Sequence, residues 1–334
     1  MKKIKVAIIG YGGIARVHNN SYHKLSLEGF PVELVAVCDK DPGRITAKLD
    51  FNLGNDNLPL PDNIHIYSDI DELIAKEEFE VADICLPTFL HKDVTVKLLN
   101  SGKNVLCEKP MALSGEDCDE MVRAANESGK KLMIAQVLRF DRAYRFLREC
   151  VMSGRYGKLD NIYMDRHSVY PTWGISFTNN ALVGGATLDT HIHDVDVARF
   201  IFGEPDSVYA TEFSEPPKYQ VVTSTLKFGS TTAIVNCSWD SAYTKAFTFG
   251  YRARFENASV VCADGAVTVT EIGGEPQPVE LPDTDGTTEE IRYFIGGVIS
   301  GNDDLQNPPT SSASSVKLIE KIRESARENK VIVL

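Results

Sequence analysis

Residues 3–15 read KIKVAIIGYGGIA, an apolar run that leads directly into three closely spaced glycines. The apolar run is typical of a buried strand, and the residues after it have the spacing of a helix. Gly10, Gly12 and Ala15 fit the fingerprint Gly-x-Gly-x-x-Gly/Ala, which allows a tight turn, close backbone approach to a pyrophosphate and close helix–strand packing. An isolated match is often an ordinary glycine turn, but the position between a strand and a helix favours a dinucleotide site.

The phosphates of that dinucleotide would lie on the N–H groups at the start of the helix, mainly those of Gly13 and Ile14. Asp39 ends the next predicted strand, near the spacing of about 20 residues expected for an acidic partner of the adenosine ribose. Its carboxylate would repel a 2′-phosphate, which favours NAD, while Lys40 and Arg44 leave NADP open. The alternative for Asp39 is a turn residue before the proline that follows.

The first 136 residues alternate short apolar runs with helical patterns. We expect strands over residues 3–9, 33–38, 65–67, 81–86, 104–107 and 131–135. We expect helices over residues 14–25, 42–49, 70–76, 93–101 and 115–128, and a mobile surface loop over residues 51–64. Strand–helix alternation of this kind predicts an α/β fold with a doubly wound parallel sheet, the Rossmann arrangement, over residues 1–136.

The pattern of predicted secondary structure changes after Gln136. A helical pattern over residues 141–153 precedes β-rich segments at residues 159–167, 206–213, 220–228, 231–239, 245–256 and 258–270. We expect only two further helices, near residues 188–202 and 314–328. Residues 137–334 are therefore predicted to form an α+β domain with a large, mainly antiparallel open-faced sheet.

The composition excludes several classes of protein. The 334 residues include 35 Lys and Arg against 47 Asp and Glu, a net charge of −12 that argues against nucleic-acid binding. No apolar run reaches the roughly 20 residues that span a bilayer, and the first residues do not resemble a signal peptide. Seven cysteines without a Cys-x-x-Cys pair speak against disulfides and zinc. We expect a cytoplasmic protein without a metal.

Lys109 lies in the tripeptide EKP at the carboxyl end of the fifth predicted strand. Ligands of open α/β sheets bind outside the carboxyl ends of the strands, so its ammonium would face the cofactor crevice. There it could hydrogen-bond a substrate oxygen and stabilise negative charge on that oxygen. The alternative is an ordinary surface lysine.

Residues 184–196 read GGATLDTHIHDVD. On a helix from about Leu188, Asp189 and His193 lie at i and i+4 on one face, where the carboxylate can orient the imidazole. Such an imidazole is suited to take a proton from an alcohol near neutral pH. A solvated ion pair is the alternative; a zinc site with His191 is disfavoured, because His at i and i+2 point to different faces.

These motifs, in this order, resemble the glucose–fructose oxidoreductase/inositol dehydrogenase/MocA-like (Gfo/Idh/MocA) family. The resemblance also covers Leu86-Pro87-Thr88-x-x-His91 and Gln136…Arg139-Phe140, although Thr88 stands where Asn is common. His191 stands where a small residue is usual, and it would either add a substrate contact or be an exposed residue without a role. It implies an N-terminal Rossmann domain and a C-terminal open-faced sheet that forms a homodimer or homotetramer.

The resemblance also implies roles for individual residues. Lys109 matches the catalytic lysine, and Asp189 and His193 match the dyad of inositol dehydrogenase-like members. The implied cofactor-binding residues are Gly10, Tyr11, Gly12, Gly13, Ile14, Asp39, Lys40, Arg44, Leu86, Thr88, His91, Glu108, Lys109 and Gln136. Around the substrate we expect Lys109, Arg139, Tyr144, Arg166, His167, Trp173, Asp189 and His193.

The implied function is an NAD(P)-dependent oxidoreductase that transfers a hydride between a secondary alcohol of a sugar, polyol or sugar acid and the nicotinamide. His193 would act as acid/base, and Lys109 would orient the reacting oxygen. Two alternatives stay open: a dinucleotide-binding sensor or regulator without turnover, and a redox-neutral glycoside hydrolase that uses NAD transiently.

Overall fold

The computed structural model describes residues 2–46, 58–172, 179–245, 247–302 and 305–334. The chain forms two compact units. The first comprises Met1–Gln136 and Thr287–Ser314, and the second comprises Val137–Gly286 and Ser315–Leu334.

The first unit thus takes in residues 287–314, which the sequence analysis assigns to the second domain. Side chains of this segment bond to the first unit. Thr288 Oγ1 donates to Ser21 Oγ at 3.0 Å, and Asn307 Nδ2 donates to the carbonyl oxygen of Ile134 at 2.5 Å. These contacts join residues more than 150 positions apart in the sequence, so no local pattern predicts them.

The first unit contains a six-stranded parallel sheet in the order β3-β2-β1-β4-β5-β6. Its strands are β1 (Ile4–Ile9), β2 (Val32–Cys38), β3 (His65–Tyr67), β4 (Val81–Ile84), β5 (Asn104–Glu108) and β6 (Leu132–Ala135). Its helices are α1 (Gly13–Leu27), α2 (Gly43–Thr46), α3 (Ile70–Lys76), α4 (His91–Asn100), α5 (Gly115–Ser128) and most of α10 (Gly286–Ser300). The strand order reverses between β1 and β4, the point at which doubly wound sheets bind ligands. The predicted parallel α/β fold is confirmed.

Local sequence signals explain why several bounds agree with the expectation. The Asp69 side chain caps α3 by accepting from two backbone N–H groups, and the Ser114 side chain caps α5 by accepting from the N–H of Asp117. Gly129 ends α5 in the left-handed conformation, with φ +63°. The predicted helix over 42–49 is described only as α2, because residues 47–57, with much of the expected loop, lie outside the described residues.

The second unit contains a nine-stranded sheet in the order β14-β13-β12-β11-β7-β10-β9-β8-β15. Its strands are β7 (Leu159–Ser168), β8 (Ser207–Glu215), β9 (Tyr219–Phe228), β10 (Thr231–Asp240), β11 (Phe247–Phe255), β12 (Ala258–Ala263), β13 (Ala266–Glu271), β14 (Gln277–Pro278) and β15 (Ile332–Val333). All neighbouring strands pair antiparallel except β7 and β10, which are parallel. The mainly antiparallel sheet is confirmed.

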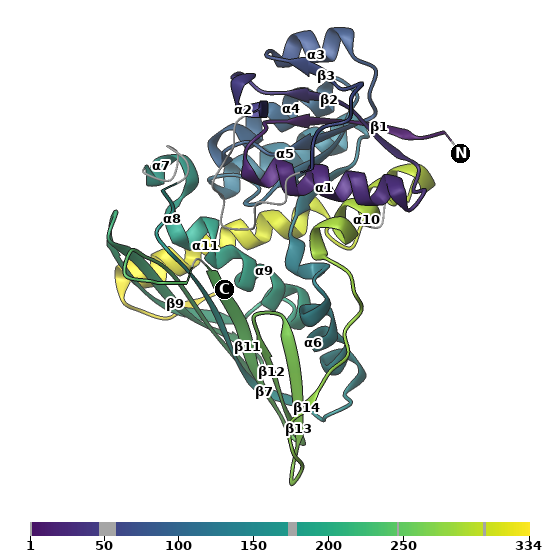
Figure 1. Ribbon diagram of the computed structural model, residues 1–334. Helices are drawn as coiled ribbons and strands as arrows, with labels where there is room; N and C mark the ends of the chain where they lie inside the picture. The colour runs from purple at the N-terminus through teal and green to yellow at the C-terminus, as the bar shows by residue number, and fades with distance from the viewer. Residues whose placement is uncertain (1, 47–57, 173–178, 246, 303–304) are drawn as a thin grey trace. The chain divides into compact units, whose positions relative to one another are not determined.

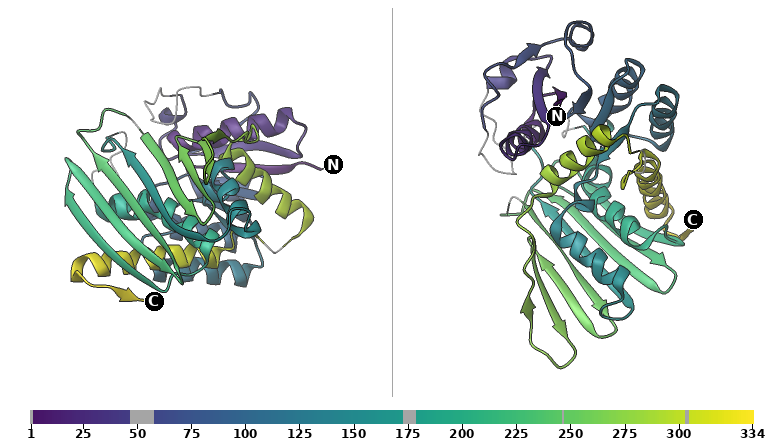
Figure 2. Two further views of the ribbon diagram at one scale, coloured as in Figure 1. Left: turned by 90° about the horizontal axis from the view of Figure 1, so that it is seen from below. Right: turned by 90° about the vertical axis from the view of Figure 1, so that its right-hand side faces the viewer.

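Helices cover one face of this sheet (Figures 1 and 2). They are α6 (Arg142–Ser153), α7 (Asn180–Val183), α8 (Gly185–Asp189), α9 (His191–Phe202) and the C-terminal part of α11 (Pro309–Glu328). Residues of β9 alternate strictly between buried and half-buried, as expected for a sheet with one covered face.

The expectation of only two further helices is wrong. The helix predicted near 188–202 is divided into α8 and α9, and α7 and α10 are additional. Gly296 and Gly297 lower the intrinsic helix propensity of α10. Burial of Ile291, Phe294 and Ile295 offsets that cost, which only the tertiary structure reveals.

All seven cysteines are buried, and none of them forms a disulfide. Among the described residues, no helix combines the length and hydropathy needed to cross a membrane.

Two glycines give a test of this packing. A Cβ on Gly250 of β11 would lie 2.2 Å from the carbonyl oxygen of Cys262 on β12, so Gly250→Ala should lower the unfolding free energy by about 1–3 kcal/mol. A Cβ on Gly296 of α10 would meet nothing within 4 Å, so Gly296→Ala should raise it by up to about 1 kcal/mol. Urea unfolding measures both, and shifts of the same sign would contradict the described packing.

Candidate active site

The glycine turn after β1 has the geometry that its sequence demands. Gly10 has φ +87°, its N–H donates to the carbonyl oxygen of Cys38 at 2.7 Å, and a Cβ there would lie 2.7 Å from Leu86 Cδ2. Among the described residues, a Cβ on Gly12 would meet nothing within 4 Å, and no side chain caps α1. The backbone N–H groups of Gly13 and the next residues thus lie at the start of α1 without a capping side chain, as an anion-binding site requires.

Asp39, which follows β2, braces this turn. Its Oδ2 accepts from the N–H of Tyr11 at 2.8 Å, and its Oδ1 accepts from the N–H of Asp41 at 2.9 Å. The turn role that the sequence left open is thus present. A carboxylate has about four acceptor positions, so two remain for a further ligand. Lys40 and Arg44 are exposed beside it.

The segment after β4 carries Leu86, Thr88 and His91. The His91 ring is buried, with Nδ1 2.8 Å from the carbonyl oxygen of Pro110 and Nε2 2.7 Å from that of Leu86. Burial lowers the pKa of His91. The ring thus joins the segment after β4 to the one after β5, and its nitrogens face backbone oxygens. Thr88 is also buried.

Lys109 directly follows β5, and among residues 105–112 it alone is not buried. Its backbone N–H donates to Glu108 Oε2 at 2.9 Å. Gln136, after β6, is buried, and its Nε2 has no hydrogen-bond partner among the described residues. Both residues follow the carboxyl ends of parallel strands, at the ligand-binding edge of such sheets.

In the second unit, residues 185–199 are buried with two exceptions, Asp189 and His193. They do not lie on one continuous helix, because α8 ends at Asp189 and α9 begins at His191. Thr190 between them accepts from Trp239 Nε1 at 2.8 Å and donates to Asp189 Oδ2 at 3.3 Å. The expected i,i+4 pair on one helix is therefore wrong, although both side chains reach solvent.

His191 is fully buried, and its Nε2 lies 2.8 Å from Ser224 Oγ on β9. Burial lowers the pKa of His191 to about 3, so the ring is neutral at physiological pH. It is therefore not an exposed residue.

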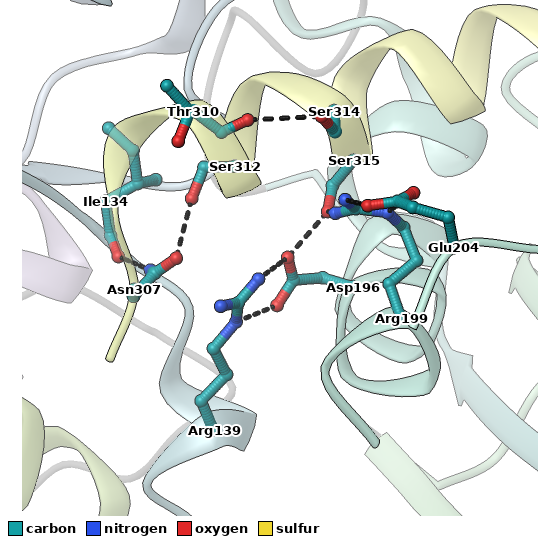
Figure 3. A network of polar contacts seen from close by, with 10 residues as sticks. All are labelled: Ile134, Arg139, Asp196, Arg199, Glu204, Asn307, Thr310, Ser312, Ser314 and Ser315. Carbon is teal, nitrogen blue, oxygen red and sulfur yellow. Dashed lines mark hydrogen bonds and ion pairs between the residues drawn. The ribbon is translucent and has the colours of Figure 1, made fainter. Parts of the chain in front are cut away.

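Two acidic residues of α9 bind the arginines that the sequence analysis placed around the substrate. Arg139 donates from Nε and Nη2 to the two oxygens of Asp196, each at 2.7 Å, and Ser315 Oγ donates to Asp196 Oδ1 at 2.6 Å (Figure 3). Arg199 also donates to Ser315 Oγ and pairs with Glu204. This geometry favours a structural role for Arg139.

Arg166 and Tyr144 bind the other acidic residue, Asp194. Arg166 Nε donates to Asp194 Oδ2 at 2.6 Å, and the Tyr144 hydroxyl donates to Asp194 Oδ1 at 3.2 Å. All three side chains are buried. The contacts join α9 to β7 and α6, so they hold the helix that carries His193.

His167 lies on the other face of the sheet. Side chains alternate along β7, and while Arg166 is buried against α9, His167 lies 2.8 Å from Ser238 Oγ and stacks on Tyr243. The structure therefore does not bring His167 together with Arg166. Trp173 lies outside the described residues.

One polar residue of the first unit was missed. His18 of α1 is fully buried between Asp83 of β4 and Glu108 of β5. The only sequence signal for this contact was a histidine within the helix that follows the glycine turn. That signal does not identify Asp83 and Glu108 as its partners, because they lie 65 and 90 positions further along the chain.

Comparisons with known proteins cover both units. Residues 4–136 match the family model described as "Oxidoreductase family, NAD-binding Rossmann fold", and residues 144–268 match the GFO/IDH/MocA C-terminal domain. A 2,7-anhydro-N-acetylneuraminate hydratase of Mediterraneibacter gnavus is 31% identical over 63% of this chain and 53% of that protein. An inositol 2-dehydrogenase of Salmonella typhimurium is 30% identical over 67% of this chain and 61% of that protein.

The match thus spans a little over half the length of these curated relatives. Among solved structures, the aldose-aldose oxidoreductase from Caulobacter crescentus complexed with glycerol has a TM-score of 0.83 over all of both chains. Its sequence identity is 23%, so this likeness concerns the fold.

His191 gives a pH test. Because its pKa is about 3 in the fold and about 6.5 when unfolded, its stabilising contribution is complete above pH 6.5 and is lost as the pH falls. Between pH 8 and pH 5 the wild type should lose about 2 kcal/mol of unfolding free energy that His191→Asn retains. Urea unfolding at both pH values measures this difference, and equal losses would refute it.

Proposed function

The chain belongs to the Gfo/Idh/MocA family of oxidoreductases, and we propose that it is an NAD-dependent dehydrogenase that oxidises a secondary alcohol of a sugar, polyol or sugar acid. One observation carries the proposal. The buried segments 105–112 and 185–199 leave only Lys109, Asp189 and His193 accessible, and these are the residues that such chemistry needs.

Several features of the first unit fit NAD. The uncapped start of α1 and the open space at Gly12 suit a pyrophosphate, to be held by the N–H groups of Gly13 and Ile14. The remaining acceptor positions of Asp39 suit the ribose hydroxyls. Gln136 Nε2, which has no hydrogen-bond partner within the described part of the chain, offers a donor at the edge where a nicotinamide would bind. When bound, NAD supplies the hydride acceptor.

The residues of this chain would then share the work on the substrate hydroxyl. His193 takes the hydroxyl proton as general base, and the negative charge of Asp189, four residues earlier in the chain and also accessible, favours the protonated imidazole. Lys109 donates a hydrogen bond to the same oxygen and favours the negative charge that develops as the proton leaves. Because the other residues of segments 105–112 and 185–199 are buried, these three side chains are the ones in the two segments that a substrate would reach.

A second candidate is a redox-neutral reaction in which NAD is reduced and then regenerated in each turnover. The 2,7-anhydro-N-acetylneuraminate hydratase among the relatives favours it, since hydration involves no net oxidation. Incubation with NAD and a panel of polyols, sugars and sugar acids separates the two. The dehydrogenase accumulates NADH at 340 nm with product, whereas the redox-neutral enzyme forms product without NADH.

The catalytic assignment is tested by His193→Asn and Lys109→Met. Loss of the base should lower kcat by about 10²–10⁴-fold, and loss of the ammonium by at least about a hundredfold, because each stabilises the transition state. The Kd of NAD, measured by intrinsic fluorescence, should stay unchanged. Lys103→Met, at the other end of the same strand segment, is the matched control and should keep its kcat. Near-normal turnover in either active-site variant would refute the assignment.

Cofactor preference is tested by Asp39→Ser. Removing the carboxylate should lower kcat/KM with NAD and raise it with NADP, shifting their ratio by about tenfold or more, since about 1.4 kcal/mol of differential binding is a factor of ten. Asp41→Ser, which changes an exposed carboxylate two residues further along, is the control and should leave the ratio unchanged. An unaltered ratio in Asp39→Ser would exclude the proposed ribose contact.

A further inference from the structure

His18 lies in the middle of a fully buried cluster in the first unit. Its Nδ1 is 2.8 Å from Asp83 Oδ2, and its Nε2 is 3.1 Å from Glu108 Oε1. The Tyr22 hydroxyl donates to the same Asp83 oxygen at 2.8 Å. The cluster thus joins α1 to the neighbouring strands β4 and β5.

Proton counting defines the state of the ring. Asp83 Oδ2 accepts from the Tyr22 hydroxyl, and the His18 Nδ1 donates to the same oxygen. The second contact, from Nε2 to Glu108, also needs a proton, because an unprotonated nitrogen and a carboxylate are both acceptors. The pair of His18 and Glu108 therefore holds one additional buried proton.

The other groups that face the ring agree with this state. Cys85 Sγ lies 3.6 Å from Nδ1, and Glu290 of α10 brings a further buried carboxyl group close to His18 and Glu108. Burial alone would lower the pKa of His18, but the charge of Asp83 raises it well above its ordinary value. A ring with both nitrogens protonated cannot ligate a metal ion, so the cluster does not act as a cation site in this state.

Glu108 connects the buried cluster to the backbone of Lys109. Glu108 binds His18 through Oε1, and its other oxygen, Oε2, accepts from the backbone N–H of Lys109 at 2.9 Å. A carboxylate held at one oxygen presents the other in a fixed direction. His18 also lies on α1, the helix whose first turn would hold the phosphates of the dinucleotide.

We propose that His18 is a positioning residue: through the proton that it shares with Glu108, it fixes the backbone of Lys109 relative to the cofactor helix α1. This inference rests on the proposed dehydrogenase function for its kinetic consequence, but the contact itself can be measured without a substrate.

The kinetic test compares His18→Gln with Tyr22→Phe. The glutamine keeps much of the shape but cannot carry the charge, so kcat should fall by about tenfold to a hundredfold through misplacement of Lys109, with KM and the Kd of NAD unchanged. Tyr22→Phe removes one hydrogen bond from the same buried cluster without touching Glu108, and its kcat should stay at the wild-type value. Equal effects of the two variants on kcat would overturn the proposal.

The spectroscopic test uses no substrate. In ¹⁵N-labelled protein, both His18 ring nitrogens should have imidazolium shifts between pH 6 and pH 9, and Glu108→Gln should convert Nε2 to the unprotonated form. The amide resonance of Lys109 should move in His18→Gln and not in Tyr22→Phe. A neutral His18 ring in the wild type, or an unmoved Lys109 amide, would overturn the proposal.

The two tests separate the possible failures. If His18→Gln does not fold, the ring shifts of the wild type and of Glu108→Gln still decide the protonation. If the wild type turns over no substrate while the Lys109 amide responds to His18, the proposed function fails and the positioning role stands. If the wild type is active and His18→Gln matches it, the positioning role fails alone.

Discussion

Asp194 and Asp196 are buried on one helix, α9, and each is bound by the guanidinium of an arginine from another element. Buried carboxylates are costly unless they are paired, and removing one partner of such a pair typically costs about 3–5 kcal/mol. The two arginines therefore fix the position of α9 within the second unit. His193 lies on that helix, one residue before Asp194, so its placement depends on these two ion pairs.

The first unit uses the same constraint in two other places. Asp39 accepts from the backbone of the glycine turn, and Asp83 pairs with His18, whose other nitrogen binds Glu108 next to Lys109. Each of these buried carboxylates holds the backbone or a side chain next to a proposed functional residue, and Asp39 in addition keeps two acceptor positions for the ribose. Most of the charges that position the accessible groups are thus buried.

The division between buried positioning charges and accessible groups suggests how related proteins can include both an inositol 2-dehydrogenase and a hydratase. The base, carboxylate and ammonium proposed for this chain would be able to act on a hydroxyl group in either chemistry. The buried pairs that hold them do not depend on the substrate. Differences in the reaction would then come from the exposed residues around the three groups, which the fold constrains least.

Local sequence determined much of this protein. Alternation of strands and helices predicted the parallel sheet, the spacing of Gly10, Gly12 and Ala15 predicted a turn that only glycine can form, and the position of Lys109 followed from the end of a strand. These features depend on residues close together in the chain, whose hydrophobic period and backbone conformation are set locally.

Only the tertiary structure decided which polar side chains pair with one another. Arg139 and Asp196 are 57 positions apart, and His18 and Glu108 are 90. Thr190, between α8 and α9, accepts from Trp239, which is 49 positions away. No local period encodes such contacts, because a buried charge requires a partner but does not specify where in the chain that partner lies. For this reason the sequence placed Arg139 and Arg166 beside the substrate, whereas the fold pairs them with α9.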